Sequence, residues 1–113
     1  MSASRGVIAR QAAPLFAALG DTTRLALVRR LSVEGPLSIT RLSERSGVTR
    51  QAITRHLHSL GRAGLVRDTR QGREHVFSLD LKRLEVAREY LDQVSAQWDA
   101  AAARLKAFVE AEE

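Results

Sequence analysis

The sequence predicts a mainly α-helical fold with a small β-hairpin. Two short helical segments, residues 39–46 and 50–63, are separated by Gly47, and a glycine there suits the tight turn of a helix-turn-helix. Residues 65–67 and 75–79 then show the pattern of strands on either side of a turn at 70–73, which is typical of a β-hairpin. This order of elements indicates a winged helix-turn-helix, in which the second helix of the pair fits a DNA major groove.

The second helix of the pair is predicted to have one apolar face and one polar face without acidic residues. Thr49 suits its N-cap, because the hydroxyl can accept a hydrogen bond from a first-turn amide, and Gly64 suits its end, because glycine tolerates positive φ. No Asp or Glu lies between Arg50 and Val66, and a polyanionic partner explains that bias. A merely hydrated face is the alternative. The residues expected to contact DNA from this helix are Thr49, Arg50, Gln51, Thr54, Arg55 and His58.

The segments on either side are predicted to hold this helix and to extend the contact with DNA. Ser38 suits the N-cap of the first helix, Leu42 is expected to be buried, and Val48 is expected to fill the gap between the two helices. The hairpin, or wing, carries Arg70 and Arg73 at its turn. These arginines are expected to lie along the DNA backbone or to enter a minor groove, with simple solubilisation of the turn as the alternative.

Two helices are predicted before this motif. Proline is best tolerated in the first turn of a helix, so Pro14 predicts a helix from residue 12 or 13 to Leu19, preceded by a flexible or partly helical arm over residues 1–11. Asp21 suits the N-cap of the next helix, which is expected to run to about Ser32 before the break at Gly35 and Pro36. Its expected core face carries Leu25, Val28 and Leu31.

The C-terminal segment predicts one long helix with a heptad seam. Asp80 suits its N-cap, and apolar residues then recur at alternating spacings of 3 and 4 from residue 84 to 108. A helix of about thirty residues is about 45 Å long, more than a small winged domain can cover. We therefore expect dimerisation through the terminal helices, with an intramolecular core as the alternative. The seam residues assigned to the dimer are Leu84, Leu91, Val94, Trp98, Leu105 and Phe108, with Trp98 expected to pack there in preference to stacking on a ligand.

The chain is expected to form one structural domain in three parts. The arm covers residues 1–11, the winged helix-turn-helix DNA-binding domain covers 12–80, and the dimerisation helix covers 81–113. Of the net charge of +5, residues 1–80 contribute 13 basic against 6 acidic residues, whereas residues 81–113 hold 5 against 7. The positive charge therefore lies on the predicted DNA-binding part.

Composition argues against metal, redox and membrane functions. The chain has no cysteine, so disulfides and thiolate metal sites are excluded. His56 is expected to be a packed histidine with a satisfied ring nitrogen, and His75 is expected to be structural or a phosphate contact; three scattered histidines without cysteine do not make a zinc set. No apolar run approaches a membrane span and the N-terminus lacks the apolar core of a signal peptide, so we expect a cytoplasmic protein without a membrane partner or a cofactor.

Three segments in the right order resemble the ArsR/SmtB transcriptional repressors. LFAALGDTTRLALVRRL is similar to their "LADPTRLxIL" opening, VTRQAITRHLHSLGRAGLV to their recognition helix, and GREHVFSLD to their wing and exit strand. The resemblance implies a dimeric repressor that binds operator DNA and is released by a signal. Many members sense metals through cysteines in the first helix of the motif or through Asp, His and Glu in the last helix. ITRLSERSG has no thiol and the last helix has no histidine, so the chain resembles the branch without metal ligands, whose tail is seen here as QWDAAAARLKAFVE.

These observations predict a DNA-binding transcriptional regulator, a homodimeric repressor on a two-fold operator that does not sense metals. The expected partners are double-stranded operator DNA, a second copy of the chain and a small-molecule effector of unspecified identity. An enzyme is not expected, because the sequence has no glycine-rich phosphate loop, no nucleophile paired with a base and no carboxylate pair placed for catalysis. The alternative is a winged-helix adaptor that binds protein; such a module would be expected to have lost Arg50, Arg55 or the wing arginines.

Overall fold

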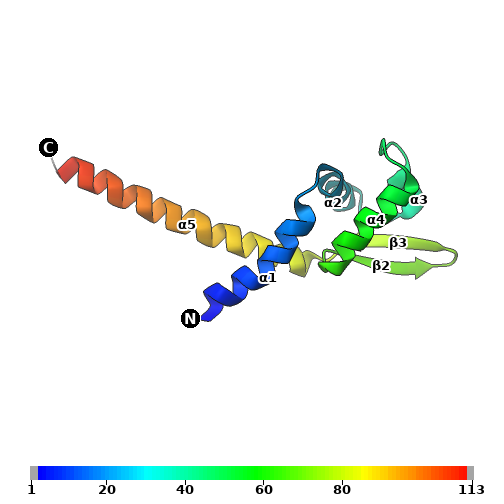
Figure 1. The fold of residues 1–113 in the computed structure, drawn as a ribbon, viewed down its shortest axis with the longest axis horizontal. Coiled ribbons are helices and arrows are strands. Elements are labelled where there is room, and N and C mark those ends of the chain that lie inside the picture. The colour runs from blue at the N-terminus through cyan, green and yellow to red at the C-terminus, as the bar shows by residue number, and fades with distance from the viewer. Residues whose placement is uncertain (1–2, 112–113) are drawn as a thin grey trace.

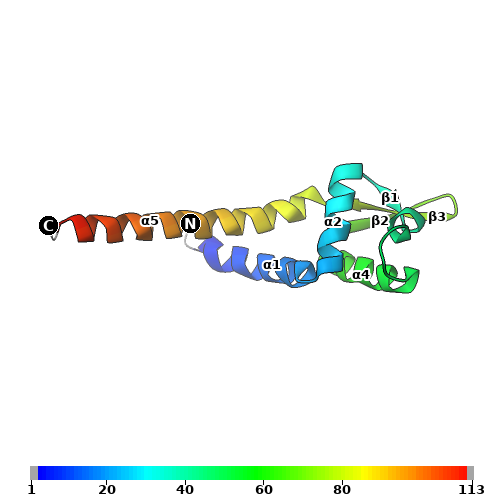
Figure 2. The same cartoon turned by 90° about the horizontal axis from the view of Figure 1, so that it is seen from above.

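The structure is a computed structural model that describes residues 3–111, and a helical body with a hairpin wing occupies one end of it. A single long helix leaves the body and extends past the N-terminal end of α1 (Figures 1 and 2). The molecule measures 69 × 31 × 20 Å as a result. The elements are α1 (Ala3–Leu19), α2 (Thr22–Glu34), β1 (Leu37–Ser38), α3 (Ile39–Ser43), α4 (Arg50–Arg62), β2 (Val66–Gln71), β3 (Glu74–Leu79) and α5 (Leu81–Ala111).

The wing is a hairpin extended by a third, very short strand. Strands β2 and β3 pair antiparallel from Val66 opposite Leu79 to Gln71 opposite Glu74, which confirms the predicted hairpin. Strand β1 adds to the other edge of β3, so that the sheet order is β1-β3-β2. Two residues are too few to show an alternating pattern, and β1 was therefore not predicted. It ties the segment before α3 to the wing.

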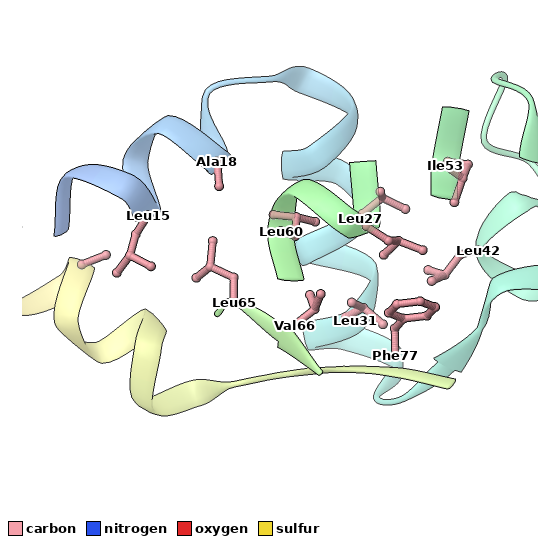
Figure 3. Close-up of a cluster of buried hydrophobic side chains, with 12 residues drawn as sticks. Leu15, Ala18, Leu27, Leu31, Leu42, Ile53, Leu60, Leu65, Val66 and Phe77 are labelled. Atoms are coloured by element: carbon pink, nitrogen blue, oxygen red, sulfur yellow. The ribbon is translucent and has the colours of Figure 1, made fainter. Parts of the chain in front are cut away.

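One apolar core joins the helices to the sheet. Leu27 and Leu31 of α2, Leu42 of α3 and residues of α4 meet around Phe77 of β3 (Figure 3). Six large side chains are essentially inaccessible to water and thus define the centre of this core. They are Leu15, Leu42, Ile53, Leu57, Leu60 and Leu65.

The predicted core face of α2 was wrong at one position. Leu25 is 51% exposed, whereas Leu27 and Leu31 are buried. The inward stripe of the helix also includes Arg24, whose guanidinium donates from Nε to the carbonyl oxygen of Ala18 at the end of α1. The inward-facing residue in the first turns of α2 is therefore the polar Arg24 and not Leu25, which apolar spacing had predicted.

The predicted start of α1 was also wrong, because the helix begins at Ala3 and continues through Pro14. Residues 3–11, expected as a flexible or partly helical arm, are therefore helical. A proline inside a helix costs about 3 kcal/mol, because it removes a hydrogen bond and crowds the preceding turn. Here Pro14 is exposed, while Ile8, Ala12 and Leu15 form a buried stripe that crosses it. Helix α1 packs along α5, and this burial offsets the cost.

The turn of the helix-turn-helix is longer than predicted. Helix α3 ends at Ser43 instead of Ser46, and the turn that follows contains two left-handed residues, Arg45 with φ 59° and Gly47 with φ 76°. Val48 is 38% exposed and does not fill the gap between the helices, since Leu42 and Ile53 already do so. The sequence alone offered a single glycine as the turn and no sign of the left-handed arginine.

Helix α5 is covered by its own chain only near its beginning. Ala87 is buried, Leu84 packs against the core, and the ring of Tyr90 meets that of Phe16 edge-on with centroids 5.9 Å apart. Leu84, assigned to the dimer seam, is therefore packed within its own chain, because α1 lies along the first turns of α5. From Leu91 onward the large apolar side chains of the seam are exposed. Within residues 3–111 no helix is both long and apolar enough to cross a membrane.

Two glycines at the end of α4 should respond to alanine with opposite signs. Gly64 has φ +81°, and a Cβ there would lie 2.9 Å from Nε of Arg83, so Gly64→Ala should lower the free energy of unfolding by about 1–2 kcal/mol. Gly61 is helical, and its Cβ would meet only Cγ2 of Val66 at 4.0 Å, so Gly61→Ala should raise that free energy by about 0.5–1 kcal/mol. Urea unfolding of both variants tests this; a shift of the same sign in both would contradict it.

Candidate nucleic-acid interface

Helix α4 is built as predicted, with its two faces cleanly divided. Thr49 caps it by accepting a hydrogen bond from the amide of Ala52 at 3.0 Å. Ile53, Leu57 and Leu60 are buried on the inner face. The assigned contact residues on the other face are exposed except for one half-buried residue, Thr54, whose hydroxyl donates to the carbonyl oxygen of Arg50 at 2.9 Å. The exposed ones are Thr49, Arg50, Gln51, Arg55 and His58.

Arg50 is held towards the first helix of the pair. Its Nη1 donates to the hydroxyl of Thr40 at 3.3 Å, across the turn between α3 and α4. Thr40 was not among the predicted contact residues, because a short helix gives too few positions to define an outer face. The structure places its exposed hydroxyl beside a predicted contact residue at the start of α4.

The end of α3 is capped by an arginine from a different helix. Nη1 of Arg30, on α2, donates to the carbonyl oxygens of Arg41 at 3.1 Å and Leu42 at 3.3 Å. Glu34 accepts from Nε of the same side chain at 3.1 Å and holds it in place. The last carbonyls of a helix lack partners within it, so this arginine stabilises the short α3 and the turn that leads into α4.

The wing carries its two arginines at an exposed tip. Gly72 turns the chain with φ 64°, and Nε of Arg70 donates to the carbonyl oxygen of Gly72 at 3.4 Å. Arg73 follows directly and is exposed. The wing extends from the end of the body that lies opposite to the C-terminal end of α5 (Figure 1). His75 pairs across the strands with Asp68, Nδ1 to Oδ1 at 2.9 Å, which supports its structural interpretation.

The base of the wing is tied to the start of α5 through Asp80. One carboxylate oxygen accepts from the amides of Lys82 at 3.0 Å and Arg83 at 3.2 Å, and thereby caps the helix as predicted. The other oxygen accepts from Nη2 of Arg67 on β2 at 3.0 Å. The Arg67 hydrogen bond, followed by the backbone hydrogen bond from Arg83, lowers the pKa of Asp80. The carboxylate therefore stays ionised, so that wing and helix remain joined.

A second polar cluster connects α4 with the first two helices. Nη1 of Arg24 lies 3.3 Å from Nδ1 of His56, and Asp21 caps α2 by accepting from the amide of Arg24 at 3.0 Å. That backbone hydrogen bond is the main cause of a lowered pKa at Asp21. His56 is half-buried with a bonded ring nitrogen, which confirms its predicted packing role. Arg24 thus links the end of α1, the start of α2 and the middle of α4.

The electrostatics of this surface fit a polyanion. Three positions on the outer face of α4 carry arginine, Arg50, Arg55 and Arg62, and no acidic residue lies on the helix. Arg62 was not among the predicted contact residues. Within residues 3–111, no group of three His, Asp or Glu side chains is arranged to hold a metal ion.

The fold and this polar face define a winged helix-turn-helix DNA-binding protein. Residues 19–69 match the family described as "Helix-turn-helix domain". The HTH-type transcriptional regulator Rv2034 of Mycobacterium tuberculosis is 41% identical over 76 residues, which cover 67% of this chain and 70% of that protein. The ArsR-like transcriptional regulator from Rhodococcus sp. RHA1 superposes with a TM-score of 0.75 at 33% identity, covering 88% of this chain and 92% of that one. The chain belongs to the ArsR-like family of transcriptional regulators.

A further solved structure bears on assembly. The homodimeric winged helix-turn-helix DNA-binding domain Mb0332 from Mycobacterium bovis superposes with a TM-score of 0.64 at 25% identity. The match covers 81% of this chain and 83% of that domain. It therefore includes more of the chain than the helix-turn-helix alone.

Proposed function

We propose that this transcriptional regulator is a repressor that binds a two-fold operator as a homodimer. The observation that carries the proposal is the outer face of α4, which is basic, free of acids and exposed beside the wing. A helix of this kind reads the major groove with residues near its N-terminus. Arg50 and Arg55 are proposed to contact guanine in a bidentate manner, the commonest specific contact of arginine.

The wing and the remaining residues of α4 are proposed to position the protein on the duplex. Contacts to phosphate set register and orientation but carry no sequence information. Arg70 and Arg73 are suited to contact the DNA backbone or a narrow minor groove, because the wing tip that carries them is exposed. Arginine side chains are long enough to reach along the DNA strand. The further residues assigned to the groove or its edges are Thr49, Gln51, Thr54 and His58.

The dimer is proposed to form through the exposed seam of α5 together with α1. Leu91 is 52% exposed and Trp98 is 71% exposed in the single chain. A row of large apolar side chains at heptad spacing is the pattern of a helix that packs on another helix. An isologous dimer presents two copies of α4 related by a two-fold axis, so the operator half-sites should lie about 10 bp apart or a near multiple of it. The seam residues proposed for this contact are Leu91, Val94, Trp98, Leu105 and Phe108.

A footprint on DNA tests the proposal directly. Duplexes from upstream of the protein's own gene are incubated with the full chain and mapped by nuclease protection. A symmetric footprint over two major grooves on one face of the duplex is the expected result, and transcription from that promoter in a purified system should fall when the protein is added. Protection without symmetry would contradict the dimer on its operator, and a rise in transcription would contradict repression.

We propose that the releasing signal is a small-molecule effector and not a metal ion. Sites built from carboxylates alone bind soft metals weakly and with poor selectivity. Isothermal titration with Zn²⁺ should therefore show no tight binding at one ion per subunit, and chelators should leave operator affinity unchanged. Rv2034, which is similar in sequence, can be titrated with Zn²⁺ in parallel as a comparison. A stoichiometric zinc site that alters DNA affinity would overturn the prediction.

A further inference from the structure

A depression lined only by polar side chains lies between the start of α2 and the C-terminal half of α4. It has a volume of about 460 Å³ and is open to solvent. None of the residues that line it is acidic. The lining residues are Arg24, Arg55, His56, His58, Ser59 and Arg62.

The depression carries positive charge that is not neutralised within it. A guanidinium group stays protonated in proteins and offers only donors. Arg24 is engaged with Ala18 and His56, and Asp21 lies near it, with Oδ2 3.8 Å from Nδ1 of His56. The side chains of Arg55 and Arg62 form no hydrogen bond or ion pair with the residues that the structure describes. The charge of Arg62 is therefore available to an anion, and that of Arg55 is available when no DNA is bound.

The hydrogen-bonding state of His56 adds a donor. Arg24 approaches Nδ1 of His56 at 3.3 Å. A guanidinium cannot accept a hydrogen bond, so this contact assigns Nδ1 as the acceptor and leaves the ring proton on Nε2. His56 thus offers an N–H donor, and Ser59 offers a hydroxyl. The lining combines cations with neutral donors, the set that suits an oxyanion.

The depression continues the outer face of α4. Arg55, His58 and Arg62 are spaced at three and four residues, so they lie on one side of the helix. Arg24, Ser59 and Arg62 also line a second depression, against Pro14 and Ala17 of α1. An anion bound here would therefore lie between the outer face of α4 and helix α1, which is proposed to take part in the dimer.

We propose that this depression binds a phosphate group, either of the DNA backbone beside the groove read by α4 or of a free phosphate in solution. In its DNA form the proposal rests on the proposed function and adds Arg62 and Arg24 to the contacts. Arg62 is the residue to test, because it is exposed and its removal breaks no bond of the folded chain. Arg29, exposed on α2 and outside the depression, is the matched control for loss of one positive charge.

The first part of the test uses DNA. Operator affinity of the full-length wild type, Arg62→Ala, Arg62→Lys and Arg29→Ala is measured over a range of salt concentrations. If the depression holds a backbone phosphate, Arg62→Ala should reduce the slope of log affinity against log salt by about one for each bound subunit. Arg62→Lys should restore the slope, and Arg29→Ala should leave it unchanged. The preference for operator over random DNA should stay the same in all four proteins.

The second part uses inorganic phosphate without DNA. The ring resonances of His56 and His58 are followed by NMR during titration with sodium phosphate, against sodium chloride at the same ionic strength and pH. A saturable shift in the wild type that is lost in Arg62→Ala and kept in Arg29→Ala supports a site for free phosphate. If the salt slope is unchanged and phosphate acts no differently from chloride, the proposal is overturned. If the wild type binds no DNA, the proposed function fails, and the phosphate titration alone decides this site.

Discussion

Replacement of both Arg50 and Arg55 by alanine should weaken binding to the operator at least about tenfold. Each bidentate contact of arginine to guanine contributes about 1–3 kcal/mol of discrimination, and 1.4 kcal/mol corresponds to a factor of ten. The same variant should lose much less affinity for random DNA, because phosphate contacts from the rest of the surface are unaffected. Competition gel shifts with operator and random duplexes measure both quantities.

A double variant with the same loss of charge provides the control. Arg29 and Lys106 are exposed, on α2 and near the end of α5, and neither side chain forms a hydrogen bond or ion pair with the described residues. Arg29→Ala combined with Lys106→Ala should therefore retain the preference for the operator. Equal operator affinity in the Arg50, Arg55 variant and the wild type would remove these side chains from the base contacts.

A charge in the α5 seam should abolish the dimer. Leu91 is proposed to become buried when two copies associate, and an unpaired charge buried there is strongly unfavourable, so Leu91→Glu should cost several kcal/mol of association free energy. Light scattering at micromolar concentration should give twice the chain mass of 12.5 kDa for the wild type and the single-chain mass for the variant. Operator affinity should fall along with dimerisation, since one α4 per particle leaves half of the contacts.

Ala96 provides the matched position for this experiment. It is exposed, and five residues along a helix place it about 140° around the axis from Leu91. Ala96→Glu introduces the same charge on the same helix and should leave the dimer intact. A wild type of single-chain mass would contradict the dimer, and a Leu91→Glu variant that stays dimeric would exclude this helix from the interface.

The DNA-facing helix could be predicted from the sequence because its determinants are local. Ser38, Thr49 and Asp80 cap the helices that follow them, as their side chains indicated. A cap depends on a side chain and an amide two or three residues later, and both are fixed by the order of the chain. The division of α4 into faces follows in the same way from 100° per residue. These elements carry most of the proposed DNA contact.

Contacts between distant segments decided the rest. Helix α1 runs through Pro14 because packing along α5 outweighs the local cost of the proline. That packing joins segments far apart in the chain, so the spacing of residues within α1 does not predict it. Arg24 takes an inward position on α2 because its partners, Ala18 and His56, come together only in the fold. The same holds for Arg30, which caps α3 from eleven residues away. Polar partners that are far apart in the sequence produce no periodic pattern. Only the tertiary structure therefore reveals the contacts of Arg24 and Arg30 that hold α3 and α4 in place, and the depression that Arg24 lines beside α4.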